Sequence, residues 1–100
     1  MAKLERDFQR DLINEISNRF PGTVVLKNDP GYLQGFPDLT ILFPNGKWAE
    51  LECKKNSKAH KQPNQEEYIE TLNVMGFARF IFPENKEEVL NELQWFQQAQ

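Results

Sequence analysis

Near the start of the chain, apolar residues recur every four positions, which is typical of a helix with one buried side. The positions are Leu4, Phe8, Leu12, Ile16 and Phe20. Together they fall on one half of a helix, and Pro21 and Gly22 end the pattern. We therefore predict a helix over residues 3–20. Glu5 projects into the apolar half, where it either serves a function or only favours the dipole of the first helical turn.

The rest of the chain alternates between β-branched or aromatic runs and amphipathic runs. Strands are predicted at 23–27, 39–43, 47–54 and 77–82, and helices at 63–75 and after a cap at Asn85. The inward side chains of these helices are predicted to be Tyr68, Ile69, Leu72 and Met75, then Val89, Leu90, Leu93 and Phe96. Residues 28–37 contain prolines and glycines and are predicted to be a loop. This order predicts a single α/β domain over residues 1–100, with a mixed sheet flanked by helices.

The strands at 39–43 and 47–54 are predicted to form a hairpin around Pro44-Asn45-Gly46. A two-residue Asn-Gly loop would mix apolar and charged side chains on one face. A three-residue loop, with Gly46 in the left-handed conformation, separates them, because a shift of one residue reverses every side chain. In this register one face is apolar and Asp38 lies opposite Glu52. The second face carries Asp38, Thr40, Leu42, Trp48, Glu50, Glu52 and Lys54.

The second face of the hairpin holds candidate chemistry. Asp38 and Glu52 would have side-chain bases about 5 Å apart, and carboxylates that close repel each other unless a cation lies between them. Such a site suits Mg²⁺, with Mn²⁺ able to substitute, and the Cys53 backbone carbonyl is placed to be a further ligand. The Lys54 side chain is predicted to lie on the same face, where its ammonium could orient a water or balance charge on a substrate phosphate. The pattern predicts a metal-dependent phosphodiester hydrolase. The alternative is a solvent-exposed sheet face with weak surface ion pairs.

Composition and charge change this picture only locally. The chain has 100 residues and a formal net charge of -3, which does not by itself indicate a nucleic-acid binder. Lysines nevertheless gather in KKNSKAHK, residues 54–61, which we call the basic loop. Lys55, Lys58 and Lys61 are predicted to contact DNA phosphates, and the alternative is a solvated loop. His60 has no metal-ligand spacing around it and is expected to be solvated.

The remaining features bound the setting. The apolar runs are too short to span a bilayer and the first residues do not resemble a signal peptide, so we expect a soluble, cytoplasmic protein with no membrane partner. Cys53 is the only cysteine, which excludes an internal disulfide. No organic cofactor is expected. Tyr32 and Phe36, in the predicted loop, either help to open a DNA junction or anchor the loop.

Two short motifs carry a resemblance to a known family. Pro37-Asp38, followed by Glu52-Cys53-Lys54, resembles the PD-(D/E)XK signature of the restriction-endonuclease-like nucleases, and the element order resembles their αβββαβ core with an extra C-terminal helix. More narrowly, the sequence resembles the VRR-NUC family between about Glu5 and Leu90. The residues that carry this likeness are Glu5, Gly35–Leu39, Glu52-Cys53-Lys54, Gln65, Leu72 and Gly76.

The resemblance implies roles for individual residues. Asp38 and Glu52 would bind the metal and Lys54 would serve the nucleophile. Glu5 would be an outer acid of the metal site. Gln65 would be a helical polar residue that faces the catalytic groups, and the alternative for Gln65 is a solvated position at the start of a helix.

The resemblance also implies a substrate and an assembly. Small stand-alone members of the family are often viral, and they cleave branched DNA such as Holliday junctions as homodimers. Two symmetric cuts require two sites, hence two chains related by a twofold axis, with candidate contacts at Trp48, Leu93, Trp95 and Phe96. The alternatives are a nickase or flap nuclease of the same fold, or a non-catalytic DNA-binding module or inhibitor. The complete set of Asp38, Glu52 and Lys54 favours an enzyme.

Overall fold

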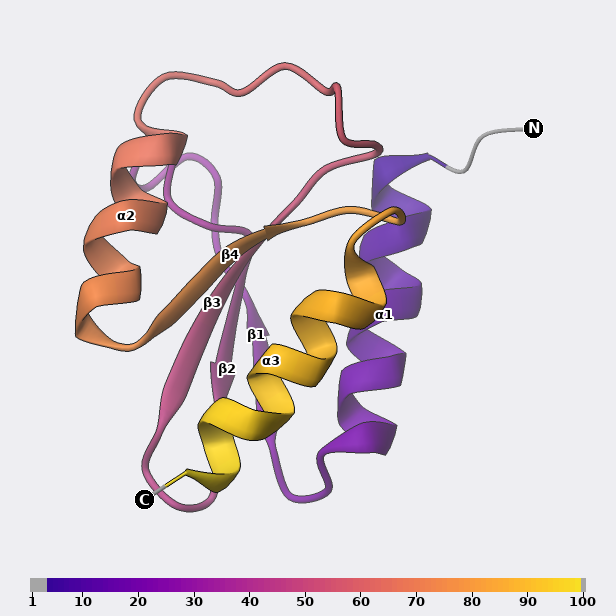
Figure 1. The fold of residues 1–100 in the computed structure, drawn as a ribbon. Helices are drawn as coiled ribbons and strands as arrows, with labels where there is room; N and C mark the ends of the chain where they lie inside the picture. Colours follow the sequence, from indigo (N-terminus) through magenta and orange to yellow (C-terminus); the bar gives the residue numbers. More distant parts are fainter. Residues whose placement is uncertain (1–3, 100) are drawn as a thin grey trace.

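The computed structural model describes residues 4–99 and has the predicted α/β fold (Figure 1). Its elements are α1 (Glu5–Arg19), β1 (Val24–Lys27), β2 (Leu39–Leu42), β3 (Trp48–Cys53), α2 (Gln65–Met75), β4 (Phe77–Ile81) and α3 (Lys86–Gln98). This is the order of an αβββαβ core followed by an extra C-terminal helix. The predicted start of the first helix at Lys3 lies outside the described residues. Among residues 4–99, no helix has the length and apolar character needed to cross a membrane.

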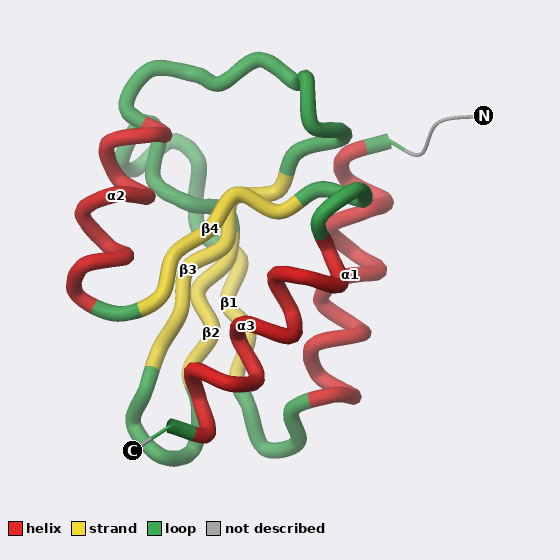
Figure 2. Tube along the Cα trace, in the orientation of Figure 1, coloured by secondary structure: helices red, strands yellow, loops and turns green. Residues whose placement is uncertain are grey.

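The four strands form one mixed sheet in the order β1-β2-β3-β4. β1, β2 and β3 pair antiparallel, whereas β4 pairs parallel to β3 after the crossover through α2. Helices α1 and α3 cover one face of the sheet and α2 covers the other (Figures 1 and 2). The loops after β1 and β3 and the start of α1 gather at one end of the sheet (Figure 2).

The hairpin has the register predicted from the three-residue loop. Leu39 pairs with Leu51 and Thr40 pairs with Glu50. The Phe43 amide donates to the Lys47 carbonyl at 2.9 Å, and Gly46 has φ +92°, so the left-handed residue in the turn is confirmed. The apolar face is fully buried beneath α1 and α3, as predicted, and consists of Leu39, Ile41, Phe43, Ala49, Leu51 and Cys53.

The second face of the hairpin is closed to solvent around its charged residues on and after β3, although Leu42 on β2 is 41% exposed. Glu50, Glu52 and Lys54 are buried, with exposed fractions of 4%, 3% and 6%. The interpretation of this face as a solvent-exposed surface with weak ion pairs is therefore wrong. It fails because α2 and the basic loop pack over the end of β3, which local periodicity does not reveal.

Two local predictions about helix ends are corrected, that of Met75 fully and that of Asn85 in part. Met75 is 68% exposed rather than inward, because α2 ends there and the chain meets the sheet through Gly76, where a Cβ atom would come within 2.9 Å of the Trp48 ring. Asn85 occupies the N-cap position of α3, as predicted, but its side chain makes no capping hydrogen bond to the helix. Its side chain instead accepts from the Phe82 amide at 2.9 Å and donates to the Phe80 carbonyl at 3.1 Å.

Candidate active site

Asp38 and Glu52 meet at the end of β3, where the long loops and the start of α1 gather (Figure 2). Asp38 directly precedes β2, and its Oδ2 accepts a hydrogen bond from the Cys53 amide at 2.8 Å. Glu52 lies one residue earlier on β3 with its side chain buried. The two carboxyl groups are close enough to share a proton. The predicted proximity of the two acids is confirmed.

The surroundings of this pair favour the protonated form. Burial raises the pKa of Glu52 to about 8, with a further upward contribution from the charge of Asp38 that the Lys54 ammonium partly offsets. Burial also raises the pKa of Asp38, against the hydrogen bond from the Cys53 amide and the contact with Glu52. Two desolvated carboxylates this close do not both ionise readily, and the charge of Lys54 offsets this only in part. In the absence of metal, the pair is therefore harder to ionise fully than two separate, solvated acids.

One oxygen of Glu52 makes the pair a candidate cation site. Its Oε2 accepts from Gln65 Nε2 at 2.9 Å. Apart from a proton shared with Asp38, no donor among the described residues reaches its buried Oε1. A buried polar atom left without a partner costs about 1–3 kcal/mol. A divalent cation would remove that cost and let both acids ionise.

The donor set at this end of the sheet fits Mg²⁺. It offers the carboxylates of Asp38 and Glu52, and the Cys53 amide that donates to Asp38 places the backbone of the third predicted ligand, the Cys53 carbonyl, at the same end of β3. No group of three or more His, Cys, Asp or Glu side chains within residues 4–99 is arranged to hold a metal. Mg²⁺ suits such a sparse set, because it commonly takes one or two carboxylates and keeps several waters. Metals that need a closed cage of protein ligands do not fit.

Lys54 is fixed beside the acids. Its side chain is buried, and its Nζ donates to the His60 carbonyl at 3.0 Å while lying 3.9 Å from Glu52 Oε2. The predicted return of the ammonium to the acidic face is confirmed. The His60 side chain is exposed, as predicted, so the basic loop reaches Lys54 through its backbone. The ammonium is thus positioned without any substrate.

Gln65 belongs to the site rather than to the solvent. It is the first residue of α2 and the residue of that helix that is buried. Its Nε2 donates to Glu52, and its Oε1 accepts from the Gln62 amide at 2.8 Å. The alternative of a solvated residue is wrong. These two bonds restrain Gln65, which in turn orients the Glu52 carboxylate.

Glu5 lies at the rim of the site. It is exposed at the start of α1, yet burial of part of the group and the charge of Asp38 raise its pKa, while Lys54 and Lys55 lower it. Glu5 therefore lies close enough to Asp38 and Glu52 for their charges to interact. Its position suits an outer acid, and the role implied by the resemblance stays a prediction.

The lysines differ in their surroundings. Lys55 and Lys58 are exposed on the basic loop. Lys61 instead lies over the Phe80 ring at 4.4 Å and 4.0 Å from Glu66 Oε1, so its ammonium already has partners within the chain. Lys27, the exposed last residue of β1, lowers the pKa of Asp38 through its charge. Lys27 is thus a second cation whose charge acts on the acids, in addition to Lys54.

Beside the two acids, hydrogen bonds link Asn28, Thr40 and Glu50 into a polar network that the sequence analysis did not predict. Asn28 donates from its side chain to the Pro37 carbonyl and to Thr40 Oγ1, both at 2.9 Å, and from its amide to the Asp38 carbonyl at 2.8 Å. Thr40 donates in turn to Glu50 at 2.8 Å. Burial raises the pKa of Glu50 to about 7 despite these bonds. An asparagine directly after a strand was the available signal.

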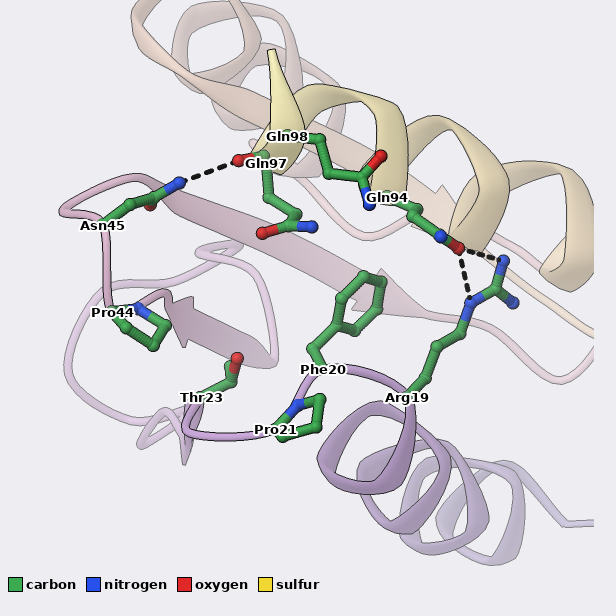
Figure 3. Close-up of a pocket in the computed structure, with 9 residues that line it drawn as sticks. All are labelled: Arg19, Phe20, Pro21, Thr23, Pro44, Asn45, Gln94, Gln97 and Gln98. Carbon is green, nitrogen blue, oxygen red and sulfur yellow. Dashed lines mark hydrogen bonds between the residues drawn. The ribbon is translucent and has the colours of Figure 1, made fainter. Parts of the chain in front are cut away.

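A hollow at the opposite end of the sheet offers different chemistry (Figure 3). It has a volume of about 340 Å³ and is lined by Arg19, Phe20, Pro21, Thr23, Pro44, Asn45, Gln94, Gln97 and Gln98. Its one cation, Arg19, already donates to Gln94 at 3.0 and 3.2 Å. The lining holds amides and no carboxylate. This hollow therefore lacks the acids on which the predicted chemistry depends, which lie at the Asp38 end.

No protein-family model matches this sequence, and no match was found among the curated proteins. The geometry of the site and the chemistry of its residues therefore carry the functional argument.

Proposed function

We propose that this chain is a Mg²⁺-dependent endodeoxyribonuclease. The observation that carries the proposal is the close pair of partly buried Asp38 and buried Glu52. Apart from a proton shared with Asp38, no donor among the described residues reaches Glu52 Oε1, and the pair stands beside the restrained ammonium of Lys54. Carboxylates that bind a divalent cation, next to a cation that faces a phosphate, are the parts that phosphodiester hydrolysis requires. The motif resemblance to the VRR-NUC nucleases supports the same class.

Each residue has a role that its contacts support. Asp38, Glu52 and the Cys53 carbonyl would hold Mg²⁺ or Mn²⁺, which when bound lowers the pKa of a water and offsets charge on the phosphate. The Cys53 amide orients Asp38, and Gln65 orients Glu52. Lys54 is restrained by the His60 carbonyl, so its ammonium can orient the attacking water or balance charge at the phosphate. Preorganised charge of this kind stabilises a transition state without a reorganisation cost.

The rival class is a DNA-binding module or inhibitor without activity. Such a protein needs cations toward the phosphates, and buried acids near them would weaken binding. Here burial raises the pKa of both Asp38 and Glu52, a cost that a binding surface does not require. Perturbed carboxyl groups with a specific partner set are typical of catalytic sites. This contrast favours the enzyme.

We propose branched DNA, such as a four-way junction, as the substrate and a homodimer as the active form. Symmetric cuts need a second site from a second chain. Fewer residues are available for a dimer contact than the sequence predicted. Leu93 is fully buried, and the Phe96 ring packs on the Phe77 ring with centroids 5.3 Å apart. Trp95 is 74% exposed and remains available on α3. A nickase or flap nuclease would use the same site as a monomer.

The deciding experiment compares labelled four-way junction, flap and duplex DNA with Mg²⁺ and with EDTA. We expect Mg²⁺-dependent cleavage that is fastest on the junction and lost in Asp38→Ala. Glu88→Gln, which changes an exposed acid on α3, is the matched control and should cleave normally. Unchanged cleavage by Asp38→Ala would overturn the site, and absence of cleavage on every substrate would favour the binding module.

A further inference from the structure

The loop between β1 and β2 holds a hollow that the proposed catalytic roles do not use. It has a volume of about 430 Å³ and is lined by Asn28, Asp29, Tyr32, Leu33 and Phe36. The loop lies at the same end of the sheet as the basic loop (Figure 2). Because the Asn28 amide donates to the Asp38 carbonyl at 2.8 Å, the hollow begins directly beside the segment that carries Asp38.

The two aromatic residues of this loop have different roles. Phe36 packs edge-on against Tyr68 of α2, with ring centroids 5.3 Å apart, and so anchors the loop. Tyr32 is 81% exposed beside Leu33, which is 42% exposed. An aromatic side chain that exposed contributes little to the core, yet it lines a hollow whose base is anchored. Tyr32 is therefore available to a ligand.

Charge around the hollow indicates which part of a nucleic acid it fits. Asp29 lines it, and its Oδ1 accepts from the Gly31 amide at 2.8 Å. A carboxylate repels phosphate but can accept a hydrogen bond from the amino group of a base. The cation nearby, Lys27, lies outside the hollow and acts on Asp38. Phosphate is thus favoured at the cations Lys27 and Lys54, and an uncharged, flat group is favoured at Tyr32.

We propose that this hollow receives an unpaired nucleobase next to the cleaved phosphate, stacked on Tyr32. The inference rests on the proposed nuclease function and adds a requirement to it, namely that the DNA offers a base that can leave its stack near the cut. Base–aromatic stacking is tolerant of sequence. The pocket would therefore select branched or locally open DNA over continuous duplex without reading its sequence.

The test uses a four-way junction with 2-aminopurine at the branch point, in metal-free buffer. When the wild-type protein saturates the junction, we expect stacking on Tyr32 to quench the fluorescence of 2-aminopurine. Tyr32→Phe keeps the ring and should keep the quench, whereas Tyr32→Ala should lose it. Because Tyr32 is exposed, neither change should alter the melting temperature.

Cleavage with Mg²⁺ gives a second, matched readout. Tyr32→Ala should lower kcat/KM about tenfold on the normal junction, on the scale of one lost base–aromatic stack. On a junction with an abasic site at the same position, wild type and Tyr32→Ala should cleave equally, because no base remains to stack.

The outcomes separate this inference from the proposed function. Cleavage with equal rates for Tyr32→Ala and wild type on the normal junction would overturn the base pocket alone. Quenching that depends on Tyr32, without any cleavage, would support the pocket and overturn the enzyme. A lower molecular mass of Tyr32→Ala in light scattering would assign the hollow to a second copy of the chain and overturn the inference.

Discussion

Towards the end of β3, the two faces of the hairpin are buried to a similar degree by opposite kinds of side chain. On β3, Leu51 is fully buried beneath α1 and α3, and its neighbour Glu52 is 3% exposed on the face covered by α2. Burying apolar surface stabilises the fold, whereas burying a charge without a full set of partners costs free energy. One face therefore holds the molecule together. The other keeps charged groups in a fixed, costly arrangement, which is what a reactive site needs.

The largest expected effects come from substitutions at two adjacent residues of β3, one on each face of the hairpin. Glu52→Gln should reduce Mg²⁺-dependent cleavage to the background rate, because it removes a proposed metal ligand, while the metal-free melting temperature at pH 8 stays the same or rises. Leu51→Ala should instead cost about 2–5 kcal/mol of stability, as expected for a core truncation. Cleavage assays and urea unfolding measure the two effects. If Glu52→Gln unfolded the protein while keeping its activity per folded molecule, the division between the faces would be wrong.

A smaller effect is expected where α2 meets the acids. Gln65→Ala removes the donor to Glu52 Oε2 and should weaken Mg²⁺ affinity about 10–100-fold, the usual effect of losing a residue that orients a metal ligand. Cleavage at saturating Mg²⁺ should recover in large part. Glu66→Ala, at the exposed next position of α2, is the control. An activity loss that extra Mg²⁺ does not reverse would show that Gln65 acts otherwise.

The charged face should also make stability depend on pH. Burial raises the pKa of Glu50 to about 7 and that of Glu52 to about 8, from 4.5. Between these limits the folded state binds more protons than the unfolded state, so metal-free stability should fall as pH rises from about 4.5 to 8. Thermal melts across this range measure the trend. Glu50→Gln should flatten it, and a melting temperature that rises from pH 5 to pH 8 in both proteins would contradict the burial argument.

The smallest effect concerns the basic loop above this face. Replacing Lys55 and Lys58 with Gln should weaken junction binding and lower its salt dependence by up to about one unit of slope per lost phosphate contact. Lys61→Gln should change the slope less, because Lys61 already contacts Phe80 and Glu66. Binding titrations at several salt concentrations test both. Equal slopes for all proteins would make the loop a solvated segment.

The fold and the inner pair of acids follow from local patterns. Helical periodicity predicts α1, and the segregation of apolar from charged residues predicts the hairpin register, since a shift of one residue would place charge in the core. That register alone brings Asp38 opposite Glu52. Both patterns act between residues close in the sequence, where geometry leaves few choices.

Only the tertiary structure decided how the acids are surrounded. The contacts of Lys54 with the His60 carbonyl and of Gln65 with Glu52 depend on where the basic loop and α2 return to the sheet. The same packing buries Glu50, Glu52 and Lys54, which local periodicity alone would leave exposed to solvent. It also anchors Phe36 against Tyr68 and leaves Tyr32 exposed. Local periodicity does not predict where these segments pack on the sheet, because the free energy that selects their positions comes from packing between distant segments.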